Sequence, residues 1–145
     1  MQYKRGVFRK FIEQEDAMVT KKITKDLGRT FPGNEEFKIN HETGDNRLYN
    51  VLKAYSAYDP ETGYCQGMNF ISAMLIQMMP DQEDAFWCLV YVMFVRDWRS
   101  IFSNDSERIN QMISDTEAYL RRNHRQVSAH LQGQTIATIG SCFSS

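Results

Sequence analysis

Residues 85–95 read Ala-Phe-Trp-Cys-Leu-Val-Tyr-Val-Met-Phe-Val, the most apolar stretch of a 145-residue chain. A helix with this composition is apolar on nearly every face, so it needs neighbours all round rather than a core on one side. The stretch falls well short of the roughly 20 residues that a membrane-spanning helix requires. It therefore predicts a buried helix at the centre of a helical bundle.

The residues before this stretch mark where its helix begins and what precedes it. Asp81 follows Pro80 and can cap the helix, and Glu83 and Asp84 place negative charge in the first turn, where the helix dipole favours it. Apolar residues at three- and four-residue steps predict one helix that Pro80 ends and an earlier one that Asp59-Pro60 ends. These two helices carry Phe70, Ile71, Met74, Leu75 and Met78, and Leu48, Val51, Leu52, Tyr55 and Tyr58, respectively.

The same spacing continues toward both ends of the chain. Near the amino end one apolar stripe predicts a single helix that stops near Thr30, because Pro32 disfavours helical geometry in the residue before it. Residues 32–45 are turn-rich and predict a loop. Another helix is expected from Asp105 or Ser106, and residues 124–139 give a weaker pattern. The amino-terminal stripe is Phe8, Phe11, Ile12, Val19, Ile23 and Leu27, and the later helix should turn Ile109, Met112, Ile113, Thr116 and Leu120 inward.

No strand-like alternation interrupts these helices, so the predicted fold is an all-α helical bundle, and the length suits one domain over residues 1–145. A net charge of −1 gives no electrostatic case for nucleic acid. Cys65, Cys88 and Cys142 form no C-x-x-C pair, so neither a disulfide framework nor a metal site is indicated, and free thiols suit a reducing cytosol. Residues 1–10 lack the apolar run of a signal peptide.

Two short blocks stand out against this background. The first, residues 23–32, is Ile-Thr-Lys-Asp-Leu-Gly-Arg-Thr-Phe-Pro, and the second, residues 63–70, is Gly-Tyr-Cys-Gln-Gly-Met-Asn-Phe. Asp26 and Arg29 are three residues apart, so they share one face of a helix and can pair. Gly63 and Gly67 flank the second block's glutamine and allow its backbone to bend tightly.

Together the two blocks resemble the catalytic signatures of the TBC domain, the module that switches off Rab-type small GTPases. Ile23, Asp26 and Arg29 fill the I-x-x-D-x-x-R pattern, and Tyr64 and Gln66 fill the Y-x-Q pattern. Either pattern alone arises by chance, whereas both in this order are specific. TBC domains are also all-α.

The resemblance implies a GTPase-activating protein that regulates vesicle trafficking. Arg29 would be an arginine finger and Gln66 a glutamine finger that replaces the GTPase's own. Asp26 would orient Arg29, Ile23 would anchor that turn in the core, Tyr64 would pack beneath the finger and Gly67 would let the backbone approach the partner. The partner would be a Rab-type GTPase in its GTP-bound form, and the chain would be no enzyme and would need no cofactor. It would be cytoplasmic, without a membrane span, and recruited to endomembranes through its GTPase.

The resemblance also has departures. The family's amino-terminal block with its tryptophan is not recognisable, and TBC domains are longer than this chain, so a partial domain, truncated at the carboxyl end, is expected. Part of the apolar surface of residues 85–95 should then face water. The alternative is a catalytically inactive TBC-like module that binds or scaffolds a GTPase or another trafficking partner.

Overall fold

A computed structural model describes residues 4–30, 46–102 and 106–133. Within these ranges the chain forms eight α-helices and no strand, which confirms the all-α prediction. The chain divides into two compact units, Met1–Arg99 and Ser100–Ser145. The loop predicted over residues 32–45 lies outside the described residues.

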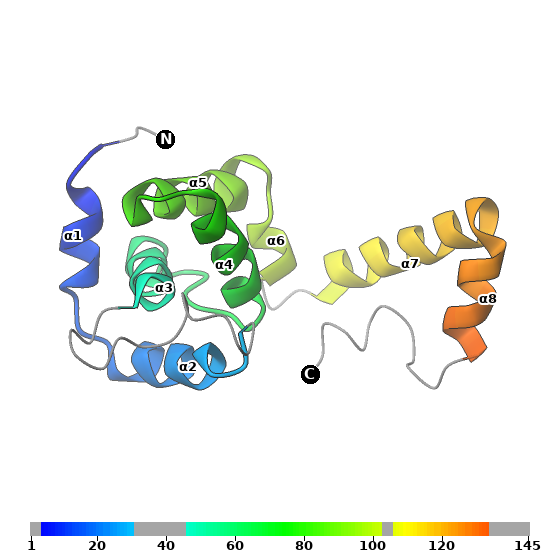
Figure 1. The fold of residues 1–145 in the computed structure, drawn as a ribbon, viewed down its shortest axis with the longest axis horizontal. Coiled ribbons are helices and arrows are strands. Elements are labelled where there is room, and N and C mark those ends of the chain that lie inside the picture. The colour runs from blue at the N-terminus through cyan, green and yellow to red at the C-terminus, as the bar shows by residue number, and fades with distance from the viewer. Residues whose placement is uncertain (1–3, 31–45, 103–105, 134–145) are drawn as a thin grey trace. The chain divides into compact units, whose positions relative to one another are not determined.

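The described part of the first unit holds five complete helices, four of them arranged around α3 (Figure 1). They are α1 (Val7–Ile12), α2 (Ala17–Leu27), α3 (Arg47–Tyr58), α4 (Met68–Met78) and α5 (Gln82–Val95). The central position expected for residues 85–95 belongs instead to α3, which contacts α1, α2, α4 and α5. Helix α5 buries one side against the core and leaves Tyr91, Phe94 and Val95 exposed. The fully buried side chains of α3 include Leu48, Val51, Leu52 and Tyr55.

The stripe that predicted one amino-terminal helix is divided between α1 and α2, so that prediction is wrong. The break is local: the carboxylate of Asp16 accepts hydrogen bonds from the backbone N–H groups of Met18 and Val19 at 2.9 and 3.0 Å and starts a new helix there. Both helices pack on α3, and α2 also contacts α4. The apolar residues keep helical spacing across both helices, so the cap at Asp16 is the feature that marks the boundary between α1 and α2.

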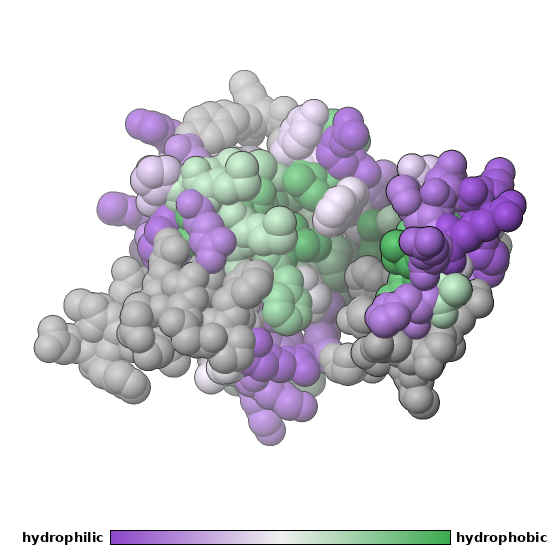
Figure 2. Space-filling model, turned by 45° about the vertical axis from the view of Figure 1, so that its right-hand side comes forward, coloured by the Kyte–Doolittle hydropathy of each residue, from purple (hydrophilic) through white to green (hydrophobic). Residues whose placement is uncertain are grey.

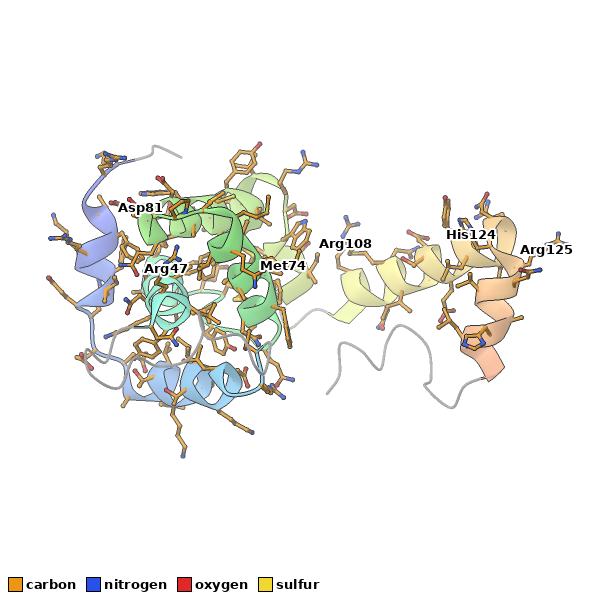
Figure 3. All side chains as sticks on the ribbon, viewed as in Figure 1. Arg47, Met74, Asp81, Arg108, His124 and Arg125 are labelled. Carbon is orange, nitrogen blue, oxygen red and sulfur yellow. The ribbon has the colours of Figure 1, made fainter. Side chains whose placement is uncertain are left out.

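Two contacts fix the junction between α4 and α5. The guanidinium of Arg47 donates to the carbonyls of Met79 and Pro80 at 2.6 and 2.8 Å, which satisfies acceptors just beyond the end of α4. Asp81 then accepts from the Glu83 N–H at 2.8 Å, so the predicted cap of α5 is confirmed. Figure 3 labels Arg47 on α3 and Asp81 at the start of α5.

Helix α4 packs through an unexpected face. Phe70, Met74 and Met78 belong to its apolar stripe but are exposed, and apolar side chains are visible at the surface of this unit in Figure 2. The face toward α3 and α5 is built instead from Met68, Asn69, Ser72, Ala73 and Ile76. Because three of these five residues are small or polar, hydrophobic periodicity alone does not reveal this face.

A short helix that the sequence did not indicate, α6 (Arg99–Phe102), follows α5. The second unit contains α7 (Ser106–Asn123), which begins where expected, packed against α8 (Arg125–Gly133). Met112 and Thr116 are exposed rather than turned inward, although α7 packs against α8 within this unit. None of the helices that the structure describes is long and apolar enough to cross a membrane.

Candidate functional site

The first block ends α2 and extends it by one turn. Helix α2 stops at Leu27, Gly28 keeps a right-handed conformation, and the N–H of Arg29 reaches the carbonyl of Asp26 at 3.2 Å. This turn leaves the Arg29 side chain 42% exposed while the Asp26 side chain is buried. The two pair as expected, with Nη2 of Arg29 2.8 Å from Oδ1 of Asp26. Ile23, one turn earlier, is fully buried and anchors the helix in the core.

The second oxygen of Asp26 connects the first block to the second. The buried phenol of Tyr64 donates to Oδ2 of Asp26 at 2.6 Å. Burial, and then the hydrogen bond to Asp26 and the negative charge of its carboxylate, raise the pKa of Tyr64, so the phenol stays neutral and remains a donor. A single carboxylate therefore holds the guanidinium of one block and the phenol of the other.

A second bridge runs beside the first. The amide of Asn69 donates to the hydroxyl of Thr30 at 2.7 Å, and that hydroxyl donates to the carbonyl of Asp26 at 2.7 Å. The carbonyl oxygen of the Asn69 side chain accepts from the Gly67 N–H at 3.0 Å. Thr30 and Asn69 are both buried, so their polar atoms have these hydrogen bonds in place of water. The residue after Arg29 and the residue after Gln66 are thus connected through one side chain.

Gln66 lies exposed in the turn between these anchors. The two glycines that flank it adopt the tight bends that the sequence predicted. Gly63 has a φ of 62°, and Gly67, which precedes α4, has a φ of 99°, both in the left-handed region. The N–H of Met68 closes the turn onto the carbonyl of Cys65 at 3.2 Å. The loop therefore presents the Gln66 side chain to solvent on a backbone held at both sides.

The Cys65 side chain, between Tyr64 and Gln66, is described by its burial and by a contact with the preceding turn. Its thiol lies half-buried 3.5 Å from the carbonyl of Thr62. Burial raises the pKa of this thiol, so it stays protonated near neutral pH. In the described part of the chain no group of three or more His, Cys, Asp or Glu side chains is placed to hold a metal ion.

The structure thus brings together Asp26, Arg29 and Tyr64, and buries Ile23 beneath them. Sequence reasoning assigned no role to Thr30 or Asn69. A weak signal for both existed, since each is a polar residue next to a motif position and a buried polar side chain requires partners.

Comparison with known proteins identifies the family of the chain. The family profile described as the Rab-GTPase-TBC domain matches residues 3–143. The Rab GTPase-activating protein tbc-11 of Caenorhabditis elegans is 36% identical over 116 residues, 80% of this chain and 12% of that protein. TBC1 domain family member 1 of Homo sapiens is 37% identical over 114 residues, 79% of this chain and 10% of that protein.

A shorter relative gives a higher identity over less of the chain. Growth hormone-regulated TBC protein 1 of Xenopus laevis is 45% identical over 87 residues, 58% of this chain and 25% of that protein. The chain therefore spans a small part of the length of the relatives it matches.

Proposed function

The chain belongs to the Rab-GTPase-TBC domain family, and from that membership we propose that it accelerates GTP hydrolysis by a Rab-type small GTPase. Arg29 and Gln66 enter the partner's nucleotide site as an arginine finger and a glutamine finger. The observation that supports this most directly is the shared carboxylate of Asp26, which ties Arg29 to the loop that presents Gln66. The exposed side chains of Arg29 and Gln66 therefore belong to two segments that the buried carboxylate of Asp26 connects.

An arginine suits the first task. Negative charge spreads over the phosphoryl oxygens in the transition state of GTP hydrolysis, and a guanidinium is planar, always charged and able to donate several hydrogen bonds. An arginine supplied in trans accelerates the reaction by about 10³ to 10⁵, which corresponds to roughly 4 to 7 kcal/mol of barrier. The ion pair with Asp26 fixes the direction of Arg29 before the partner arrives, so less side-chain entropy is lost on binding.

A glutamine suits the second task. Its amide can accept a hydrogen bond from the attacking water and donate one to the phosphate at the same time. Gln66 would perform in trans the task that a GTPase's own glutamine performs. The GTP and Mg²⁺ belong to the partner, so the chain completes another protein's active site. It would act in the cytoplasm and reach endomembranes through the GTPase.

The test is phosphate release from a panel of GTP-loaded Rab proteins, with wild type, Arg29→Ala, Arg29→Lys and Gln66→Ala compared. Acceleration by wild type should be lost in Arg29→Ala and largely lost in Arg29→Lys, which keeps the charge but not the fork of donors. Lys25→Ala is the matched control, because Lys25 is an exposed basic residue of α2 four residues before Arg29. A target whose own glutamine has been replaced should still respond to wild type and fail to respond to Gln66→Ala.

The competing function is a module that binds a GTPase without activating it. Binding of wild type to a GTP-loaded Rab with no change in hydrolysis would establish that reading and reject the activating one. Equal stimulation by wild type and Arg29→Ala would reject the arginine finger while leaving activation in place.

A further inference from the structure

Residues 63–67, here called the Gln66 loop, follow a turn that is held by its own set of contacts. Residues 59–62 connect α3 to the second block, and the N–H of Gly63 closes this turn onto the carbonyl of Asp59 at 2.7 Å. Asp59 is buried, with 4% of its surface exposed. A buried carboxylate requires hydrogen-bonding or charged partners, and these identify what holds the turn.

Arg99, at the start of α6, contacts three residues of this turn. Its Nε donates to Oδ2 of Asp59 at 2.9 Å and to the hydroxyl of Thr62 at 3.1 Å. Its Nη2 donates to Oδ1 of Asp59 at 2.9 Å and to the carboxylate of Glu61 at 2.8 Å. The two-pronged contact with Asp59 is the geometry that only a guanidinium forms.

Other groups fix Arg99 and Asp59 in place. The phenol of Tyr55 donates to Oδ2 of Asp59 at 2.8 Å from inside α3. The guanidinium of Arg99 lies over the ring of Phe94, 4.5 Å from the ring centroid, in cation–π geometry. Asp59 thus connects Tyr55 of α3 with Arg99, and the turn of residues 59–62 cannot shift without breaking several of these contacts at once.

The Gln66 loop is therefore held at two ends. The Arg99 contacts hold the side that enters at Thr62, and Asn69 holds the side that leaves at Gly67. Between these anchors lie Gly63 to Gln66, with Tyr64 buried and Gln66 exposed. A catalytic side chain on a loop must be held to within about 0.5 Å of its working position, so both anchors matter for a group that acts at the tip.

We propose that Arg99 is a positioning residue for Gln66, acting through Asp59 and Thr62 on the loop that presents the glutamine finger. This inference rests on the proposed function for the role of Gln66, but the effect on loop order does not depend on it. An ordinary structural ion pair would stabilise the whole unit, whereas a positioning contact orders the loop and raises the maximal rate. The two roles therefore predict different measurements.

The experiment compares Arg99→Gln and Arg99→Lys with Arg96→Gln, a control on an exposed arginine at the end of α5. Backbone amide hydrogen exchange is followed at Gly63, Gly67 and Met68 and in α3, at a temperature where each variant is folded. Exchange in the loop should rise by about tenfold in both Arg99 variants, the factor that loss of about one net hydrogen bond produces. Exchange in α3 and in the control should stay as in wild type.

The same proteins are then assayed for GTP hydrolysis on a responsive Rab. The maximal rate should fall by about 10- to 100-fold with KM unchanged, because displacing a catalytic group by about 1 Å lowers the rate by up to that factor. In a Gln66→Ala background Arg99→Gln should add nothing further, since the loop then presents no amide to position. Arg99→Lys tests whether several guanidinium donors are needed. A lysine keeps the positive charge and so keeps Asp59 paired, but its ammonium cannot reach Asp59, Glu61 and Thr62 together.

Unchanged exchange in the loop, or exchange that rises equally in α3, would overturn the positioning role. A fall in rate of the same size with and without Gln66 would also overturn it. If wild type stimulates no Rab, the proposed function fails, and the exchange data alone decide whether Arg99 orders the loop.

Discussion

The phenol of Tyr64 lies 2.6 Å from a carboxylate oxygen of Asp26, although 38 residues separate them in sequence. The other oxygen of the same carboxylate pairs with Arg29 at 2.8 Å. Because the site is buried around Asp26, rotating the carboxylate to favour one partner would cost the other a charge-assisted hydrogen bond. The direction of Arg29 is therefore set partly by a residue of the other block.

Replacing Tyr64 with Phe tests this relationship. The substitution removes one hydroxyl, leaves a buried carboxylate with one partner fewer and should destabilise the fold by about 1.5–3 kcal/mol, the range for a hydrogen bond to a charged group. Stimulation of the partner GTPase should also fall, because Arg29 loses a fixed counterpart. Urea unfolding and phosphate release measure the two effects.

The matched control is Tyr49→Phe, which removes a hydroxyl 3.0 Å from the hydroxyl of Thr20, a contact of neutral groups that involves no residue of the two blocks. It should cost about 0.5–1.5 kcal/mol and leave stimulation unchanged. If both variants lowered stimulation equally, the loss would follow stability, and Tyr64 would have no part in orienting Arg29.

Asn69 supports a sharper substitution, because its two amide atoms have different partners. The Thr30 hydroxyl already donates its only proton to the Asp26 carbonyl, so it can accept from the Asn69 amide but cannot donate to it. Asn69→Asp keeps the size and the acceptor for the Gly67 N–H, but places an unprotonated oxygen against the Thr30 oxygen. The variant should be destabilised by about 1–3 kcal/mol near neutral pH, the cost of unsatisfied buried polar atoms.

The pH dependence of that variant has a definite sign. Protonation restores a donor toward Thr30, so the new carboxyl should have a pKa in the folded state above its unfolded value. The folded state then binds more protons than the unfolded state, and stability rises as the pH falls. Urea midpoints of Asn69→Asp and wild type, compared across acidic pH, should converge as the pH falls. A constant or widening gap would show that Asn69 does not donate to Thr30.

Much of the fold followed from the sequence because helical periodicity and caps are local. The caps at Asp81 and the starts of α3 and α7 needed no knowledge of distant residues. The division of α1 from α2 was missed because the apolar stripe continues across it, while the cap at Asp16 is a single side chain. The face of α4 was missed because its buried side combines Met68 and Ile76 with small or polar residues, which do not stand out in an apolar pattern.

The site divides in the same way. The pairing of Asp26 with Arg29 follows from a three-residue spacing on one helix and was predictable. The contacts of Thr30 with Asn69 and of Asp59 with Arg99 join residues 39 and 40 apart in sequence, and no local spacing indicates them. They depend on how the ends of α2, α3, α4 and α5 lie within the first unit, which only tertiary packing determines.

Asp59 should contribute to stability only where it is ionised. Its burial alone would raise its pKa, but hydrogen bonds from Tyr55, Thr62 and Arg99 and the charge of Arg99 outweigh burial and lower the pKa below that of an ordinary aspartate. A lowered folded pKa means that the stabilisation is complete above the unfolded value and is lost as the pH falls through the folded value. Wild type should therefore lose stability in acid relative to Asp59→Asn.

Thermal melting of the two proteins from about pH 7 to about pH 3 measures that difference. The gap between wild type and Asp59→Asn should be widest at the upper end and narrow below pH 4. If the gap stayed constant, the carboxylate of Asp59 would not be held ionised by Arg99, and the anchor of the Gln66 loop would rest on neutral contacts.

Two glycines of the blocks should respond in opposite directions to the same substitution. Gly63 has a φ of 62°, and a Cβ there would meet only the Ser56 hydroxyl at 3.8 Å, so the cost of Gly63→Ala is backbone strain of about 1–2 kcal/mol. Gly28 has a φ of −63°, and a Cβ there would meet nothing within 4 Å. Gly28→Ala should therefore stabilise the protein by about 0.4–1 kcal/mol through the unfolded chain. Urea unfolding compares them directly. Equal effects would show that the left-handed turn before Tyr64 is not required, and that the Gln66 loop tolerates another backbone path.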